Sequence, residues 1–544
     1  MTSSKYDQLD RQTLIGLLQR RDAERQLGLV WEREEIEVDQ ALNDDFVALS
    51  LDAGLSHGAA PWDNLIIEGD NYDALRALRM THKGAIRCIY IDPPYNTGNK
   101  DFVYNDSFVD KTHRFRHSLW LEFMYRRLQL AKELLADDGV IFVSIDDNEL
   151  FRLGMLMDRV FGEDNFVANV IWQKVYSPKN TAQHFSDDHE YLVVYARSRQ
   201  RWQSNPLPRS AEQDRAYKNP DNDPRGPWKP SDLSARNFYG AGTYSITSPA
   251  GRYIEAPPSG MYWRVSEQKF QELDADRRIW WGKDAKNIPA IKRFLSEVKQ
   301  GVVPQTLWKY EEVGHTQDAK KQLLEILQFD SSAEVFSTPK PVQLMERILR
   351  IASRPGDTVL DFFAGSGTFA QAVAKLNAED GGQRKFILVS STEATQDAPD
   401  KNLCRDVCAQ RVRRVLGGYT NTKGQEVAGL GGGFAYLRAK RIPKHRMALK
   451  LDHAEVWSAL QLLHGLSLSP WPGDGFAGDG ELAYLADFHA AHVQRLRDWL
   501  KIRAIAVPHV YSWSPQRLVG LLGDTAAELA LLPLPQHLRE RFGR

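Results

Sequence analysis

Short apolar runs alternate with amphipathic segments in two separated stretches of the chain. In the first stretch, apolar runs typical of buried strands occupy residues 64–69, 85–91 and 139–145. Apolar residues at helical spacing follow these runs, in the segments 73–80, 115–135 and 149–161. Buried strands that alternate with helices are typical of a doubly wound, mainly parallel sheet, so we expect an α/β fold.

The second α/β stretch lies far along the chain, in residues 341–416. A helix is expected after Pro341, a strand runs into a glycine-rich turn within 357–368, and segment 385–391 is typical of another strand. Between the two stretches, residues 165–334 carry short aromatic-rich strands punctuated by Pro, Gly and Asn. This pattern indicates a mixed domain inserted between two halves of one sheet.

The two ends of the chain follow other patterns. Residues 5–40 place leucines at helical spacing, which predicts a helical arm. The glycine-rich segment 429–434 is expected to be a hinge, and a small α/β unit with strands at 482–485 and 504–507 should follow it. We therefore expect an arm, a first sheet half, an inserted domain, a second sheet half and a C-terminal domain, at residues 1–50, 51–164, 165–335, 336–425 and 426–544.

Composition narrows the class of protein. The 544 residues are too many for one ordinary domain, and 42% hydrophobic with 26% charged residues is typical of a globular protein. Three cysteines cannot build a disulfide framework. No apolar run reaches the length of a membrane span, and the polar N-terminus lacks the apolar core of a signal peptide. These features predict a cytoplasmic protein.

Charge is unevenly distributed along the chain. The net charge of −1 does not by itself indicate a nucleic-acid partner. Residues 171–300, however, carry 21 Lys and Arg against 15 Asp and Glu, so this segment has a local charge of +6. A basic middle segment between acidic neighbours favours a polyanion as the partner of the middle segment.

The first chemical motif is Asp92-Pro93-Pro94-Tyr95, at the carboxyl end of the predicted strand 85–91. Ligands of open α/β sheets bind at that end of the strands. Methylation of an aromatic amino group needs two acceptors for its hydrogens, which the Asp92 carboxylate and the Pro93 carbonyl offer. The paired prolines fix the backbone, and Tyr95 offers a ring on which an extruded base can stack.

The second motif, Asp361-Phe-Phe-Ala-Gly-Ser-Gly-Thr368, runs from a strand through a glycine turn into a helix. Its glycines let the backbone pass close to a ligand. Asp361 suits a cationic amino group, such as that in the methionine part of S-adenosylmethionine. Glu393, which follows the next strand, suits a ribose diol, and a surface or helix-capping role is the alternative.

Two absences limit the chemistry. The glycine turn lacks the spacing of dinucleotide-binding loops, and no phosphate-binding loop with its lysine occurs in the sequence, so ATP hydrolysis by this chain is not expected. We also find no convincing cluster of metal ligands in the sequence. Methyl transfer from a sulfonium requires alignment of nitrogen, carbon and sulfur, and no metal.

The order of the two motifs resembles that of the beta-class amino DNA methyltransferases, in particular the modification subunits of type III restriction systems. The resemblance covers roughly residues 10–420. The D-P-P-Y and F-A-G-S-G-T pair in this order is highly specific. Further similar stretches lie at residues 67–75, 91–108, 142–149, 188–196, 300–308, 313–323, 336–344 and 360–368.

The resemblance implies a fold and a set of ligand-binding residues. The fold would be a permuted Rossmann-like methyltransferase, with S-adenosylmethionine as cofactor. Asp92 would lie at both the catalytic and the cofactor site. The residues implied for the cofactor, in addition to Asp361 and Glu393, are Asp70, Asn71, Ser337, Thr338, Lys340, Phe363, Gly365, Gly367 and Thr368. Lys340 before Pro341 would be a donor to the carboxylate of the cofactor.

The inserted segment 165–335 would then be the target-recognition domain. Its basic residues are candidates for phosphate or base contacts. They are Lys174, Lys179, Arg197, Arg199, Arg201, Lys229, Arg236 and Arg264. The tryptophans of this segment are expected in a core, and His189 with Glu190 matches a family pattern beside the flipped base.

Three hypotheses about function remain open at this stage. The first is a methyltransferase for adenine N6 in double-stranded DNA, which the Asp and Tyr of the motif favour. The second is a module that supplies DNA specificity to a nuclease or helicase partner, with catalysis secondary. The third moves the same chemistry to N4 of cytosine or to RNA. A homodimer and a separate restriction subunit are implied by the resemblance.

Overall fold

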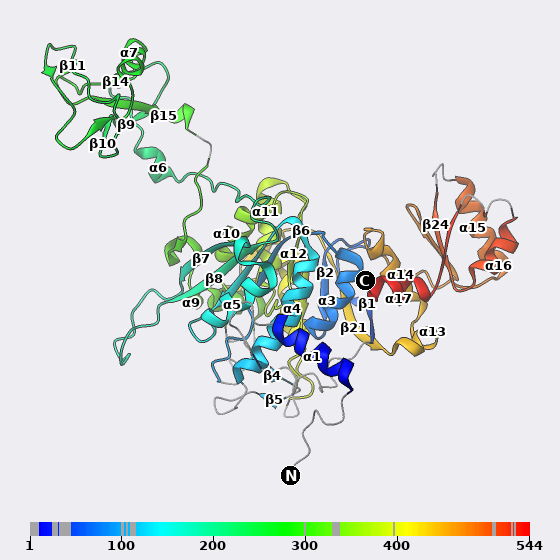
Figure 1. Ribbon diagram of the computed structural model, residues 1–544. Helices are drawn as coiled ribbons and strands as arrows, with labels where there is room; N and C mark the ends of the chain where they lie inside the picture. The colour runs from blue at the N-terminus through cyan, green and yellow to red at the C-terminus, as the bar shows by residue number, and fades with distance from the viewer. Residues whose placement is uncertain are drawn as a thin grey trace. The chain divides into compact units, whose positions relative to one another are not determined.

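The computed structural model describes most of the chain, and it divides into two compact units. The described residues are 10–23, 31, 45–98, 103–104, 107–108, 116–298, 301–328, 338–394, 398–502, 507–523, 526 and 529–543. One unit comprises Met1–Asn205 together with Gln305–Arg544, and the other comprises Pro206–Pro304 (Figure 1). Each unit is described by itself below.

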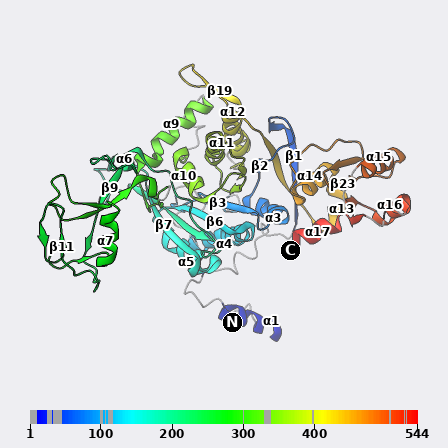
Figure 2. The same ribbon diagram turned by 90° about the horizontal axis from the view of Figure 1, so that it is seen from above.

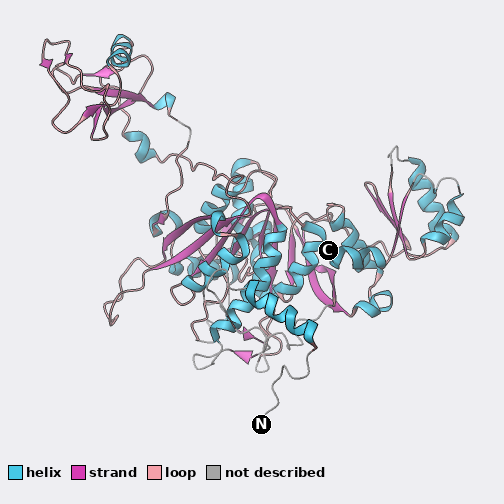
Figure 3. Ribbon diagram, in the orientation of Figure 1, coloured by secondary structure: helices cyan, strands magenta, loops and turns pink. Residues whose placement is uncertain are grey.

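A sheet of ten strands forms the centre of the larger unit (Figure 3). The strands lie side by side in the following order: β1 (Phe46–His57), β21 (Phe434–Ile442), β2 (Leu65–Glu68), β18 (Lys385–Ser390), β17 (Thr358–Asp361), β3 (Ile86–Ile91), β6 (Leu135–Ile145), β8 (His189–Ala196), β7 (Phe166–Gln173) and β16 (Leu307–Trp308). All neighbours from β21 to β6 are parallel. The expected α/β class with a mainly parallel sheet is therefore confirmed.

Helices cover both faces of this sheet, as Figure 2 shows from above. One layer holds α3 (Asn71–His82), α4 (Arg116–Leu134) and α5 (Leu150–Phe161), which contact each other in this order. The other layer holds α10 (Val342–Ala352), α11 (Thr368–Asp380), α12 (Gln410–Gly417) and α9 (Thr316–Leu327). Because both faces are covered, the central strands are mainly apolar, and every residue of β3 is buried, including Arg87.

Two strands of the sheet were not anticipated. Residues 46–57 fall partly in the expected arm, yet they form β1, and the segment after the expected hinge forms β21. Of the glycines before β21, Gly433 is closely packed, whereas a Cβ at Gly431 or Gly432 would meet nothing within 4 Å. A Cβ at Gly433 would stand 2.4 Å from the carbonyl oxygen of His57, so only glycine fits between β1 and β21.

The recognition segment expected at 165–335 is divided by the structure. β7, β8 and β16 belong to the central sheet, so only residues 206–304 form a unit of their own. That unit holds the strands β9 (Trp228–Asp232), β15 (Ala290–Phe294) and β14 (Ile279–Trp280), with α7 (Glu267–Ala275) beside them. Its core includes Trp263 and Trp281, as the sequence analysis expected of these tryptophans.

The C-terminal part carries a second, smaller sheet, with strand order β22 (Phe476–Asp479), β23 (Leu482–Leu485), β24 (His509–Ser512) and β25 (Ala530–Pro533). Helices α14 (His453–Leu463) and α17 (Gln536–Gly543) contact α3 of the main sheet. The strand expected at 482–485 is present as β23. Residues 503–506 lie outside the described part, and the next strand begins at His509.

At the N-terminus, α1 (Arg11–Ala23) lies within the expected arm. In the part of the chain that the structure describes, no helix is long and apolar enough to cross a membrane.

Truncation before Phe434 should unfold the molecule instead of leaving a working core. β21 lies between β1 and β2 and buries Phe434, Ala435, Tyr436 and Leu437 completely. Burial of one large apolar side chain contributes about 1.5–3 kcal/mol, and a whole domain is stable by only about 5–15 kcal/mol. Circular dichroism of the truncated chain should show no cooperative melting. A cooperative transition near that of the full chain would contradict the position of β21.

Candidate functional site

The two sequence motifs meet at one edge of the central sheet. β3 ends directly before Asp92, and its parallel neighbour β17 ends at Asp361. The carboxyl ends of parallel strands lie at the same edge, so the two carboxylates come from neighbouring positions although the chain between them is long. Burial raises the pKa of Asp361, and the charge of Asp92 adds to this rise.

Asp92 belongs to a network of four charged and phenolic side chains. The Lys340 ammonium donates to both oxygens of the Asp92 carboxylate, at 2.8 and 2.7 Å, and to the Tyr95 hydroxyl oxygen at 3.0 Å. The Tyr95 hydroxyl in turn lies 2.9 Å from Asp92 Oδ1 and 2.9 Å from Glu190 Oε2. Glu190 is buried at the start of β8, so three elements supply one network.

Burial and charge act against each other in this network. Burial raises the pKa of Asp92, and Glu190 adds to this rise, while Lys340 opposes it; the net pKa is raised. Burial favours the neutral form of Lys340, but the carboxylates of Asp92 and Glu190 outweigh it and raise the pKa of the ammonium. Lys340 therefore stays charged, and Asp92 is a better proton acceptor than an exposed aspartate.

The loop after Asp92 is held by contacts behind it. The Trp120 indole N–H from α4 donates to the Pro94 carbonyl oxygen at 2.7 Å, and Trp120 is completely buried. Asn96 has a positive φ of 56° and is buried, with its amide donating to Glu149. A left-handed asparagine next to two prolines leaves the loop little freedom. Because Pro94 is engaged by Trp120, the Pro93 carbonyl is the backbone acceptor to consider for a ligand.

The glycine turn between β17 and α11 passes close to its neighbours. Gly365 and Gly367 have positive φ values of 49° and 76°. A Cβ at Gly367 would stand 3.1 Å from the Cys408 carbonyl oxygen. The buried Asp361 carboxylate accepts one hydrogen bond, from the Phe363 N–H at 2.9 Å, and no ion pair to it occurs among the described residues. A buried carboxylate of this kind suits a cationic ligand group.

A buried arginine holds the far side of the turn, and the sequence analysis did not identify it. Arg411 of α12 donates to the hydroxyl oxygens of Ser366 at 3.0 Å and Thr368 at 2.6 Å, and to the Gln371 amide oxygen at 3.0 Å. Burial lowers the pKa of Arg411 to about 10, which leaves it charged at neutral pH. The Thr368 hydroxyl, expected at the cofactor, thus accepts a hydrogen bond from Arg411.

A second unanticipated arginine fixes the residues after β2. Arg127 of α4 donates to Asp70 Oδ2 at 3.0 Å and also to the side-chain oxygen of Asn71. The Asn71 amide donates to the Phe362 carbonyl oxygen at 2.9 Å, which links this corner to the glycine turn. The Arg127 guanidinium also lies 3.6 Å from the centre of the Phe123 ring, and Phe123 packs against Phe363 at 6.0 Å.

The remaining candidates for ligand binding lie apart from this cluster or outside the described residues. Ser337 falls on residues that are not described, and Thr338 is exposed. Glu393 is exposed, has a positive φ of 53° and forms an ion pair with Lys401 at 2.8 Å. A ligand diol would have to compete with Lys401 for this carboxylate.

The basic candidates divide between the two units. Lys229, Arg236 and Arg264 belong to the unit 206–304, whereas Lys174, Lys179, Arg197, Arg199 and Arg201 belong to the larger unit. Lys174 contacts Asp187 and Glu190, Arg201 pairs with Asp137, and Arg197 donates to the Lys132 carbonyl oxygen at 2.7 Å. These three are already engaged inside the larger unit. Among the described residues, no group of His, Cys, Asp and Glu is arranged to hold a metal ion.

Comparison with known proteins places the chain in a family. The family model described as DNA methylase matches residues 86–393, more than half of the chain. The Mod subunit of the type III restriction-modification enzyme StyLTI of Salmonella typhimurium is 38% identical over 65% of this chain. The EcoP15I Mod subunit of Escherichia coli is 30% identical over 62% of this chain. The type II methyltransferase M.KpnI of Klebsiella pneumoniae is 32% identical over 59% of this chain.

The matches cover the relatives unequally. The chain spans 57% of the StyLTI and 60% of the EcoP15I subunit, and 79% of M.KpnI. Among solved structures, the cytosine-N4-specific PvuII DNA methyltransferase is matched over 66% of this chain and 95% of its own, with 12% identity and a TM-score of 0.34. The complex of M1.HpyAVI with SAM is matched over 60% of this chain and 92% of its own, with 13% identity and a TM-score of 0.27. On the family match across both motifs, this chain is a member of the DNA methylase family.

Proposed function

We propose that this protein transfers the methyl group of S-adenosylmethionine to the N6 amino group of an adenine that is flipped out of duplex DNA. The observation that carries the proposal is the shared sheet edge, where the acceptor loop at Asp92 and the glycine turn at Asp361 follow neighbouring strands. Membership of the DNA methylase family supports it, as do relatives whose names describe methyltransferases and Mod subunits.

The residues around the glycine turn fit such a cofactor. The Asp361 carboxylate, buried without an ion pair among the described residues, suits an ammonium group. Gly365 and Gly367 have positive φ values that favour glycine, a Cβ at Gly367 would crowd the Cys408 carbonyl oxygen, and the N-terminus of α11 follows directly. When bound, the cofactor supplies an electrophilic methyl group on a sulfonium. The cofactor-binding roles of Asp70, Asn71 and Phe363 belong to the same proposal.

The protein's own residues would prepare the amino group for attack. The Asp92 carboxylate and the Pro93 carbonyl accept its two hydrogens, which turns its lone pair toward the incoming methyl group. Tyr95, whose hydroxyl is held by Asp92 and Glu190, presents its ring to the base. After transfer, the amino group must lose a proton, and Asp92, with its raised pKa, is the carboxylate placed to accept it.

Lys340 imposes a condition on this reaction. Its ammonium already donates to both oxygens of Asp92, so the amino group of a base must share or displace it. A cofactor carboxylate near Lys340 would provide another partner for the ammonium. Glu190, 3.5 Å away, holds the lysine nearby in either case. Lys340 is therefore assigned to the junction of the base and cofactor sites.

The DNA would be read by the unit 206–304 and by the loop between β7 and β8. The unit exposes Phe238, Tyr239 and Tyr253 close in sequence to Arg236. The loop exposes Tyr176 and Phe185 on either side of Lys179. Exposed aromatic and basic side chains together suit stacking and phosphate contacts. Because the Mod relatives are subunits of restriction-modification enzymes, we also propose a separate restriction subunit as partner. From the resemblance we further propose a homodimer, which analytical ultracentrifugation would detect.

Replacement of Asp92 by Ala should abolish methyl transfer with little effect on cofactor binding. Loss of one preorganised group at a reacting centre typically lowers the rate by about 10²–10³-fold. Asp92 would have two roles, as a hydrogen-bond acceptor for the amino group and as the base that takes its proton. Transfer is followed with radiolabelled cofactor and DNA, and cofactor binding by calorimetry. The matched control is Asp137→Ala, because Asp137 is exposed and pairs only with Arg201 in the described contacts. Activity of Asp92→Ala near that of the control would remove Asp92 from the mechanism.

Replacement of Arg127 by Met should weaken cofactor binding more than it lowers the rate at saturating cofactor. Arg127 holds Asp70 and Asn71 by charge-assisted hydrogen bonds, and loss of about 1.4 kcal/mol corresponds to a tenfold higher Kd. Arg127→Lys should recover part of the affinity. Arg126→Met is the control, since Arg126 pairs with Glu122 instead. Equal loss of kcat and affinity in both variants would indicate a general defect of folding.

Replacement of residues 206–304 by a short Gly-Ser linker should remove sequence-specific methylation and leave cofactor binding intact. The replacement is feasible because Leu207 and Val302 form an antiparallel β-bridge, so the two ends of this unit lie side by side and a short linker can join them. The full chain and the shortened chain are compared by cofactor calorimetry and by sequencing of methylated sites. Methylation of the same sequence by the shortened chain would show that recognition lies in the larger unit.

A further inference from the structure

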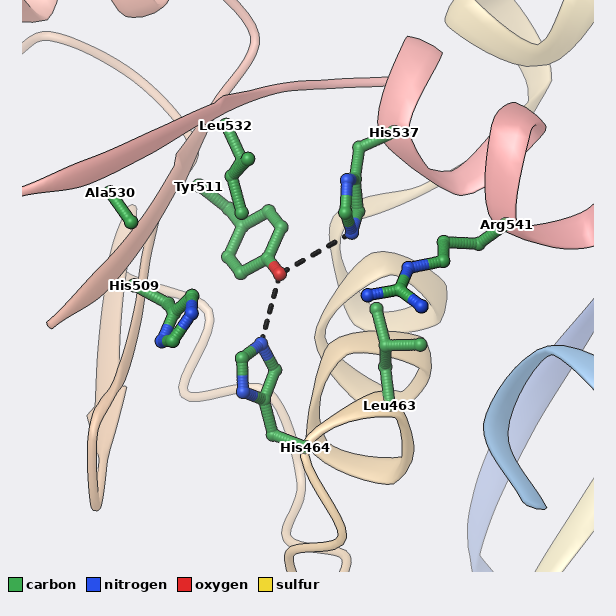
Figure 4. Close-up of a pocket in the computed structure, with 8 residues that line it drawn as sticks. All are labelled: Leu463, His464, His509, Tyr511, Ala530, Leu532, His537 and Arg541. Carbon is green, nitrogen blue, oxygen red and sulfur yellow. Dashed lines mark hydrogen bonds between the residues drawn. The ribbon is translucent and has the colours of Figure 1, made fainter. Parts of the chain in front are cut away.

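A cavity opens in the C-terminal part of the larger unit, far along the chain from both motifs. Its volume is about 380 Å³, within the range of small-molecule sites. It lies where α14, β24, β25 and α17 meet, as Figure 4 shows. The lining residues are Leu463, His464, His509, Tyr511, Ala530, Leu532, His537 and Arg541. The family match ends at residue 393, so this cavity lies outside the matched segment.

The inner end of the cavity is built from a buried phenol and imidazoles. Tyr511 is buried, and its hydroxyl lies 2.9 Å from His464 Nε2 and 3.5 Å from His537 Nε2. Figure 4 shows the two imidazoles approaching the hydroxyl from different elements. The ring of His509 stands 4.8 Å from that of His464, and its buried Nδ1 has no hydrogen-bond partner among the described residues. Buried polar atoms are nearly always paired, so this Nδ1 is an unsatisfied polar atom on a residue of the cavity wall.

The charge of the lining favours an anion. Arg541 is a permanent cation, and no carboxylate is among the eight lining residues. Burial lowers the pKa of His464, and the neighbouring His509, His537 and Arg541 lower it further; Glu481 is the acidic group that opposes them. Additional positive charge is therefore disfavoured in the cavity, and negative charge would relieve the repulsion.

A metal ion does not suit the same side chains. The Nε2 atoms of His464 and His537 are directed at the hydroxyl of Tyr511 between them, not at a common point at coordination distance. The cationic Arg541 beside them also opposes a metal cation. The observations favour donors arranged around an anion.

We propose that this cavity binds a phosphate monoester. The guanidinium of Arg541 and the imidazoles of His509 and His537 come from two different elements, β24 and α17, and offer donors from several directions, which suits the three terminal oxygens of a monoester. Leu463, Ala530 and Leu532 provide an apolar wall for the organic part. A free nucleotide and the 5′-phosphorylated end of a DNA strand carry the same group.

Calorimetric titration of the full-length protein tests the site. Thymidine 5′-monophosphate is the probe, and thymidine, which lacks the phosphate, is its control. The protein should bind the monophosphate and not the nucleoside, and Arg541→Gln should weaken binding at least tenfold. Arg539→Gln is the matched variant, since Arg539 lies on the same helix, is exposed and donates to the Lys444 carbonyl oxygen. It should bind as the wild type does.

His509→Gln provides a second variant in case Arg541→Gln fails to fold, and it should also bind at least tenfold more weakly. Absence of binding by the wild type, equal binding by the variants, or equal binding of thymidine would overturn the proposal. Displacement of the monophosphate by a 5′-phosphorylated oligonucleotide, and not by its 5′-hydroxyl counterpart, would identify a DNA end as the source. Displacement by neither, with the monophosphate bound as expected, would identify a free nucleotide.

Discussion

The pairing of β3 with β17 is the constraint on which the rest of the structure depends. It joins a strand near the start of the chain to one far along it, so Asp92 and Asp361 follow neighbouring strands at one edge of the sheet. All other features of the site are arranged around that edge: Glu190 enters from β8, Lys340 from the segment before α10, and Arg127 from α4. If β3 and β17 were not neighbours, neither motif would have a partner for its chemistry.

Charge compensation explains why this edge can hold so many ionisable groups. Asp92 and Glu190 share the ammonium of Lys340, and the hydroxyl of Tyr95 bridges the two carboxylates. Asp361, by contrast, has no ion pair among the described residues, and burial together with Asp92 raises its pKa well above the ordinary value. Charge is thus balanced around the acceptor loop, whereas no cation pairs with Asp361 among the described residues, because Arg411 donates to Ser366 and Thr368 of the turn instead. A ligand that brings its own cation to the turn complements this arrangement.

The apolar pattern predicted the strands and helices whose ends hold the site, because burial on both faces of the sheet leaves runs such as residues 85–91 largely apolar, with Arg87 as the charged residue of that run. It did not predict β1 or the sheet that β21 joins, since strand pairing over long separations leaves no local signal. The same limit applies to the site. Asp92 and Asp361 were identifiable because each lies at the end of an apolar run. Lys340 was expected to contact the carboxylate of the cofactor, whereas in the structure it donates to Asp92. Arg127 and Arg411 were missed because their partners lie far away in sequence.

Mass spectrometry of nucleosides tests the central claim most directly. Double-stranded DNA is incubated with the purified full chain and cofactor carrying an isotopically labelled methyl group, then digested to nucleosides. The account predicts labelled N6-methyldeoxyadenosine as the product, because in the proposed mechanism Asp92 and Pro93 accept the hydrogens of the adenine amino group and Tyr95 stacks on the base. Labelled N4-methyldeoxycytidine would contradict the assigned base. Absence of any labelled nucleoside, with cofactor bound, would contradict the assignment of this sheet edge as a methyl-transfer site.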